Sequence, residues 1–147
     1  MTIANHPEAE FSENFDQINY EMEAHVNDRY TQTEGVEIRF KTWWIAFTHF
    51  IVARPFDLLY MDQVTSTHLY PKVGSQPSMA FYGETRNILK AGQDEGIIKM
   101  ENISLINQFV RTSVTNVVKI NIAAGKTLTD SQINWLVDAC WDGIKSR

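Results

Sequence analysis

The sequence predicts an all-α fold, a bundle of about six helices, because apolar residues recur at spacings of three and four along most of the chain. Glycine and proline are few, with 7 and 4 among 147 residues, which argues against a loop-rich chain. No stretch of useful length alternates between apolar and polar residues as a strand would. We therefore expect a frayed N-terminus over residues 1–10 and a single all-α domain over residues 11–147.

The first predicted helix covers residues 11–30. Its apolar positions are spaced by four, three, four and four residues, so they share one face: Phe11, Phe15, Ile18, Met22 and Val26. A second helix, residues 36–53, carries a broad aromatic face. Arg54-Pro55 ends it, because the residue before a proline is pushed away from helical geometry. Pro55 then suits the first turn of a third helix, which extends to about residue 68.

The longest predicted loop, residues 70–77, precedes a fourth helix over residues 78–94. Gly96 is expected to cap this helix in the left-handed conformation. A fifth helix, residues 102–124, is apolar on most of its circumference, which is typical of a helix buried on two sides.

The last predicted helix follows a capping box, with Thr129 as the N-cap and Gln132 as the third helical residue. Its apolar positions repeat at helical spacing to about residue 146. This helix and the preceding one are therefore both expected to bury a regular apolar stripe.

Negative charge is concentrated at the start of the chain. Half of the 18 acidic residues precede Ile38, and Arg29 is the only basic residue among them. Such a region repels phosphate, so we do not expect this chain to bind nucleic acid directly. Cys140 is the only cysteine, which rules out an intrachain disulfide and makes a reducing cytoplasm the simplest compartment. No signal peptide or membrane span is expected.

A succession of landmarks runs from residue 36 to residue 147. An aromatic helix ends in Arg54-Pro55 and is followed by a short helix and a Pro/Gly-rich loop. A long helix then closes in QDEGIIK at residues 93–99, an apolar helix ends in AAGK at residues 123–126, and a terminal helix follows. This order resembles the C-terminal domain of TetR-type transcriptional regulators. The resemblance implies a homodimer formed through the last two long helices, and a pocket for a small, often apolar effector enclosed by the earlier ones.

Members of that family carry an N-terminal helix-turn-helix head that reads DNA. Here residues 1–35 are acidic and lack both the small-residue turn and the aromatic-plus-lysine segment of such a head. Residues 11–30 more closely resemble the helix that connects head and body. We therefore expect the effector-binding and dimerisation domain of a transcriptional repressor, as an excised domain or a naturally headless protein. DNA would be reached only through a head domain not present in this chain.

The predicted pocket combines aromatic walls, a flexible methionine and a few polar groups, as effector pockets usually do. The candidates are Trp44, Phe47, Met61, Phe81, Tyr82, Thr85, Phe109 and Asn116. Thr112 and Ser113 could supply further hydrogen bonds, although small polar residues in a helix can also bond back to their own backbone. Aromatic residues at helical spacing can equally form a solid core.

Two arginines allow an acidic effector, because a guanidinium binds a carboxylate through two parallel hydrogen bonds. They are Arg86 and Arg111. The alternative for each is an ordinary pairing with Glu84, Asp57 or solvent. Their positions in the sequence do not distinguish one from the other.

The predicted dimer interface uses the regular stripes of the last two helices. It comprises Val110, Val114, Val117, Ile133, Leu136, Val137, Cys140, Trp141 and Ile144. An obligate interface buries on the order of 2,000 Å² or more, and Val137→Glu would be expected to prevent dimerisation. The alternative is that both helices simply serve the core of the monomer.

Neither a metal site nor a cofactor is predicted, because the sequence has no converging set of ligands and no Gly-rich phosphate loop. Cys140 lies on an apolar stripe and is expected to pack, since a nucleophile needs exposure and an activating base. Two alternatives to the leading interpretation stay open. One is a cofactor-independent enzyme using Asp57, His68 or Glu84 as acid or base, and the other is a ligand-free interaction protein.

Overall fold

A computed structural model describes residues 17–18, 20–22, 24–26, 34–65 and 80–147, with the side chains of residues 61–65 and 80–83 outside the description. Five helices have defined bounds: α2 (Val36–Ala53), α3 (Pro55–Thr65), α5 (Ala80–Asp94), α6 (Ile103–Ala123) and α7 (Asp130–Ile144). Residues 17–26, where described, are also helical and are called here the N-terminal helical segment. The predicted all-α class is confirmed.

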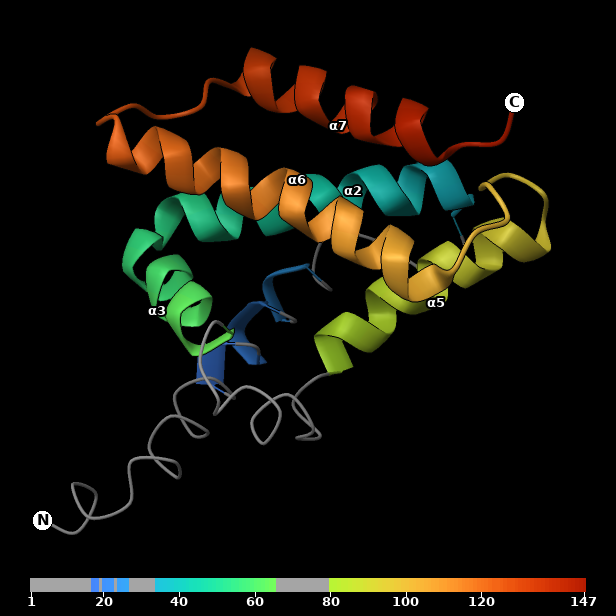
Figure 1. Ribbon diagram of the computed structural model, residues 1–147, viewed down its shortest axis with the longest axis horizontal. Helices are drawn as coiled ribbons and strands as arrows, with labels where there is room; N and C mark the ends of the chain where they lie inside the picture. The colour runs from blue at the N-terminus through green and yellow to red at the C-terminus, as the bar shows by residue number, and fades with distance from the viewer. Residues whose placement is uncertain (1–16, 19, 23, 27–33, 66–79) are drawn as a thin grey trace, which may run out of the picture.

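The aromatic helix α2 lies at the centre of the bundle, in contact with α3, α5, α6 and α7 (Figure 1). It spans the residues that the periodicity predicts, and it ends where Arg54 leaves helical geometry ahead of Pro55. Most of its circumference is buried, including Phe40, Trp43 and Trp44. Burial of such large apolar side chains contributes about 1.5–3 kcal/mol each to folding, so this helix organises the core.

The turn after α5 is built on two glycines. Gly96 has a φ of 73°, the left-handed conformation predicted for it. The amides of Ile97 and Ile98 both donate to the carbonyl of Gly92, at 2.8 and 3.0 Å. A Cβ on Gly92 would lie 2.4 Å from Cδ1 of Ile98 and 3.1 Å from Cγ1 of Val36. Glycine at position 92 therefore lets the chain fold back closely enough to bury Ile98 completely.

This turn pairs with the end of α7 in an arrangement that we call the C-terminal clasp, residues 97–99 against 144–146. The amide of Lys99 donates to the carbonyl of Ile144 at 2.9 Å, and that of Ser146 donates to the carbonyl of Ile97 at 2.8 Å. The helix α7 therefore ends at Ile144, two residues before the predicted end, because Lys145 is extended. Ser146, predicted to lie in the last helical turn, instead donates a backbone hydrogen bond to the turn that follows α5.

The helix α6 is capped at both ends, and the capping box predicted at the start of α7 is confirmed. The Asn102 side chain accepts from the amide of Leu105 at 3.0 Å at the start of α6. Gly125 follows α6 with a φ of 69°. At the start of α7, the Gln132 amide donates to Thr129 Oγ1 at 3.1 Å, and the Thr129 amide donates to Gln132 Oε1 at 3.0 Å. These bonds satisfy backbone groups that a helix end otherwise leaves unpaired.

None of the described helices is long and apolar enough to cross a membrane.

Candidate ligand site and its surroundings

The interior beside α2 is packed with aromatic rings. Trp43 and Phe47 stack with ring centroids 5.4 Å apart and an interplanar angle of 24°. Phe40 lies 5.4 Å from Trp141 of α7, measured between ring centroids. Aromatic pairs of this kind add stabilisation beyond the area they bury. This wall is the apolar part of the candidate ligand site.

The residues predicted to line the pocket fall into three groups. Trp44, Phe47 and Thr85 are buried, at no more than 1% exposure each. Phe109, at 52% exposure, and Asn116 lie on the exposed surface of α6 instead. The side chains of the remaining three lie outside the described residues: Met61, Phe81 and Tyr82. The structure thus places Phe109 and Asn116 away from the interior, because α6 turns a different face inward from the one that the sequence analysis chose.

Ser113, named as a possible donor to an effector, makes bonds inside the protein instead. Its hydroxyl donates to the carbonyl of Val110 at 2.6 Å and accepts from Trp44 Nε1 at 3.4 Å. Cys140 Sγ lies 3.6 Å from the same oxygen. Burial raises the pKa of the Cys140 thiol, and hydrogen bonds to Ser113 and Trp44 only partly oppose this effect. The Cys140 thiol therefore serves to fill the core. Thr112, the other possible donor named from the sequence, is exposed.

Two other polar residues of α6 face the interior and were not singled out as a pair by the sequence analysis. Asn107 and Arg111 are one turn apart and half-buried. Oδ1 of Asn107 is enclosed and has no hydrogen-bond partner among the described residues. Cζ of Arg111 lies over the Phe47 ring, 5.1 Å from its centroid. The sequence pattern could have indicated this orientation. Residues 107 and 111 lie beside Val110 and Val114 on the helix surface, and these two valines face the core.

The stripe predicted as a dimer interface is mostly core. Seven of its nine residues are no more than 4% exposed within a single chain: Val110, Val114, Ile133, Val137, Cys140, Trp141 and Ile144. Val117 and Leu136 are half-buried. Side chains already covered by their own chain have no surface left to offer a partner. The two stripes pack α6 and α7 onto the bundle, as the alternative considered for them requires.

The opposite face of the same two helices exposes large apolar side chains. Leu105, Phe109 and Ile120 of α6 are 55%, 52% and 66% exposed, and Trp135 of α7 is 69% exposed. We call these four residues the outer face. A Cβ on Gly143 would lie 3.6 Å from the Phe109 ring, so α7 approaches α6 closely at this point. Large apolar side chains left exposed on neighbouring helices are typical of an interaction surface.

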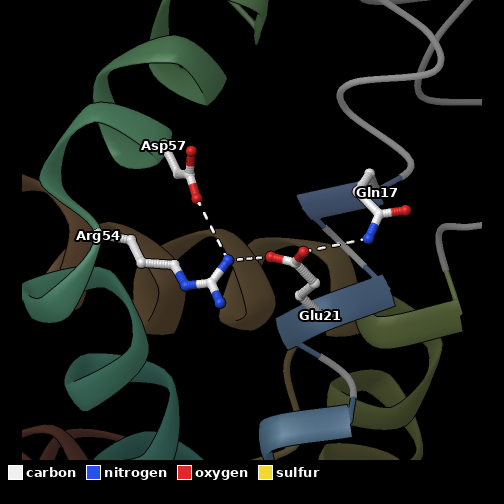
Figure 2. A network of polar contacts seen from close by, with 4 residues as sticks. All are labelled: Gln17, Glu21, Arg54 and Asp57. Carbon is white, nitrogen blue, oxygen red and sulfur yellow. Dashed lines mark hydrogen bonds and ion pairs between the residues drawn. The ribbon is translucent and has the colours of Figure 1, made fainter.

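The N-terminal helical segment is joined to the corner between α2 and α3 by a polar network (Figure 2). Nη1 of Arg54 forms an ion pair with Oε2 of Glu21 and lies 3.6 Å from Oδ2 of Asp57. Gln17 Nε2 donates to the other oxygen of Glu21 at 3.0 Å. The Arg54 guanidinium also lies 4.7 Å from the centroid of the Phe50 ring. Arg54 thus holds three segments of the chain together.

The segment also contributes to the core. Ile18, Met22 and Val26 are buried, which confirms the apolar face predicted for them. His25 packs edge-on against Phe50, with ring centroids 5.6 Å apart. The first part of the predicted helix, with Phe11 and Phe15, lies outside the described residues.

The residues considered for acid–base or metal chemistry do not converge among the described positions. Asp57 belongs to the Arg54 network, and Glu84 is half-buried on α5. His68 lies outside the described residues. Within the described part of the chain, no group of three or more potential metal ligands comes together.

Comparison with solved structures reveals the same fold in proteins of low sequence identity. The chain superposes on a TetR family transcription regulator from Marinobacter aquaeolei VT8 with a TM-score of 0.77 and 18% identity, covering 95% of this chain and 71% of that one. Superposition on a protein from Shewanella sp. PV-4, described as a TetR family regulator, gives a TM-score of 0.80 at 12% identity. The match covers 93% of this chain and 74% of that one. Superposition on a protein of unknown function from Rhodococcus sp. RHA1 gives a TM-score of 0.70 at 17% identity. The match covers 95% of this chain and 71% of that one.

No protein-family model and no curated protein matches the sequence. At these identities the likeness establishes the fold and leaves function to be argued from the residues. The chain has the all-α fold of TetR-type regulators over the part that matches them.

Proposed function

We propose that this chain is the effector-binding and dimerisation domain of a TetR-type transcriptional regulator. Its fold supports this role, because the solved regulators that it matches share nearly the whole of its length. The observation that carries the proposal is the pair Asn107 and Arg111. Arg111 packs over the buried Phe47 ring, and Oδ1 of Asn107 is enclosed one helical turn away on α6. A few polar groups among aromatic walls are what a small-molecule site requires.

In this proposal the effector is small and mostly apolar, and it binds one of two packings of the helices better than the other. Only such a difference in affinity can shift the population between them. The shift reaches the N-terminal helical segment through its contacts with Phe50 and Arg54. DNA contact is assigned to a helix-turn-helix head and not to the acidic residues of this chain.

The dimer is proposed to form through the outer face. Its four apolar residues are accessible on α6 and α7, whereas the stripes on the other side of these helices are already buried. An interface of the usual obligate size would cover about 1,000 Å² on each partner, which the exposed sides of two helices can supply. The homodimer expected from the family resemblance is thus kept, with a different set of contact residues.

Charging the outer face tests this assignment. Trp135→Glu combined with Ile120→Glu is expected to give a folded monomer, measured by sedimentation velocity at micromolar concentration. Ile38→Glu is the matched control, because Ile38 is 56% exposed and belongs to α2, which contributes no residue to the outer face. A double variant that remains dimeric would exclude the outer face as the interface. Val137→Glu is expected to unfold the chain, because Val137 is only 2% exposed.

Native mass spectrometry of the purified chain tests the proposal as a whole. The expected result is a species near twice 16.9 kDa with additional mass that leaves on mild activation. Such mass would begin to identify the effector. A bare monomer that also binds no small molecule would contradict both parts of the proposal and favour a stand-alone helical protein.

A further inference from the structure

Arg86 and Arg111, which the sequence offers equally as partners for an acidic effector, have different surroundings in the structure. Arg86 is exposed on α5. Arg111 is half-buried on α6, its Nη1 is enclosed by protein, and its Cζ lies 5.1 Å from the centroid of the Phe47 ring. An arginine packed in this way is shielded from bulk water. The attraction between this guanidinium and an anion is therefore less screened than it would be at Arg86.

Packing against Phe47 also orients the guanidinium. An aromatic ring restrains the planar group, so less entropy is lost when it forms further hydrogen bonds. A guanidinium has five N–H donors, more than a single side-chain partner can satisfy. Arg111 therefore has the chemistry to bind a carboxylate inside the bundle while keeping its intramolecular contacts.

Asn107 adds a second polar contact one turn away. Residues at this spacing on a helix have Cβ atoms about 5–6 Å apart. The enclosed Oδ1 of Asn107 accepts no hydrogen bond from the described residues. Leaving a buried acceptor unpaired is unfavourable, and a hydrogen-bond donor on a ligand would remove that penalty.

Resting on the proposed function, we infer that the effector is an organic acid with an apolar body. Its carboxylate pairs with Arg111, and a hydroxyl or amide N–H a few atoms away donates to Asn107. The apolar body packs against the aromatic residues of α2, among which Phe47 and Trp43 form a stacked pair. This assigns a charge and a chemical class to a ligand that the fold alone leaves undefined.

The test uses two matched probe series, straight-chain fatty acids and the alcohols of the same chain lengths, titrated into the full chain by isothermal titration calorimetry. For the wild-type protein we expect the best acid to bind at least about tenfold more tightly than its alcohol. Arg111→Met should abolish this preference by weakening the acid alone, and Arg111→Lys should keep part of it. Arg86→Met is the matched control and should leave the preference unchanged.

The possible results separate the inference from the proposed function. Equal affinity for acids and alcohols, or an undiminished preference in Arg111→Met, would overturn the acid assignment and leave a small-molecule sensor in place. Binding of neither series would count against both. If Arg111→Met proves unfolded by circular dichroism, the wild-type comparison and the Arg111→Lys variant still decide the question.

A second measurement addresses Asn107. Asn107→Leu removes the enclosed acceptor and should leave the preference for straight-chain acids over alcohols intact. It should weaken binding of hydroxy acids relative to the plain acid of the same length. Identical behaviour of the two kinds of acid in the wild-type protein and in Asn107→Leu would remove Asn107 from the assignment.

Discussion

The C-terminal clasp and the Arg54 network both join segments that are distant in sequence, but they do so with different kinds of bond. The clasp uses backbone hydrogen bonds, such as that from Lys99 to Ile144, beside an Ile98 side chain with no exposed surface. The Arg54 network uses the charged side chains of Arg54 and Glu21, which are 44% and 32% exposed. Among the described residues, no backbone hydrogen bond links the N-terminal helical segment to the other helices.

This difference separates the part of the molecule that is fixed from the part that can adjust. Backbone bonds next to a buried side chain set one register and are little affected by salt. An exposed ion pair contributes about 0–1 kcal/mol and is screened by salt. The end of α7 is thus held in place, whereas the N-terminal helical segment is held by apolar contacts and weak ion pairs. A segment of the second kind is suited to move when a ligand binds.

The largest expected effect comes from emptying the centre of the clasp. Ile98→Ala should lower the free energy of unfolding by about 2–5 kcal/mol, because it leaves a cavity at a fully buried site. Ile38→Ala removes the same atoms from a side chain that is 56% exposed, and it should cost less than about 0.5 kcal/mol. Urea denaturation of both variants checks the prediction. Equal losses would mean that the clasp does not stabilise the fold.

A smaller effect is expected from crowding the same turn. In a helix, Gly→Ala usually stabilises by about 0.5–1 kcal/mol. At Gly92 the new methyl group would meet Ile98 at 2.4 Å, so we expect a net loss of about 1–3 kcal/mol. Gly143→Ala is the control, because its methyl group would make an ordinary 3.6 Å contact with Phe109. Thermal unfolding should show opposite signs for the two variants, and a stabilised Gly92→Ala would refute the close packing.

Breaking the Arg54 network should hardly change global stability. Glu21→Gln should cost less than about 1 kcal/mol, because the pair with Arg54 is exposed. Hydrogen exchange should nevertheless accelerate across the N-terminal helical segment, while the amide of Ile98 stays protected. Asp94→Asn neutralises the partner of Lys90 within α5 and should leave exchange in the segment unchanged. Unaltered exchange in Glu21→Gln would show that the network does not hold the segment.

The smallest expected effect concerns a surface ion pair, in which Lys41 of α2 contacts Glu37 and Asp138. A hydrogen bond from Lys41 to Glu37 raises the pKa of Lys41 above its ordinary value, with a further contribution from Asp138. Because the folded-state pKa is the higher one, the stabilisation is present below the ordinary pKa and is lost as the pH rises through the raised value. Lys41→Met should therefore cost a few tenths of a kcal/mol near neutral pH. A variant as sensitive to alkaline pH as the wild-type protein would contradict this assignment.

The sequence predicts local structure better than it predicts the direction in which a helix faces. Local signals are sufficient at Pro55 and in the capping box of Thr129 and Gln132, because each depends on the geometry of a few neighbouring residues. The helix α6 has apolar residues on both sides, and hydrophobic spacing does not decide which side meets the core. Val110, Val114 and Val118 face inward, whereas Phe109 and Ile120 face outward.

The same ambiguity affected the candidate site. Phe109 and Asn116 looked suitable as pocket residues by type, but the orientation of α6 turns them outward. Arg86 and Arg111 could not be ranked without knowing the burial of each. What separates them is the position of the Phe47 ring, which depends on how α2 and α6 pack and is a property of the whole bundle.

The clasp also provides a fixed point about which helix α6 could rotate. The helix α6 begins at Ile103, four residues after the clasp residue Lys99, and its 21 residues span about 30 Å. A rotation of about 3° about the clasp would move its far end by about 1.5 Å, a displacement typical of helix shifts in switching proteins. That end lies on the side of the bundle where α2 passes into α3 (Figure 1). A small displacement of α6 at Asn107 and Arg111 would thus become a larger displacement at its far end, on the same side of the bundle as Arg54.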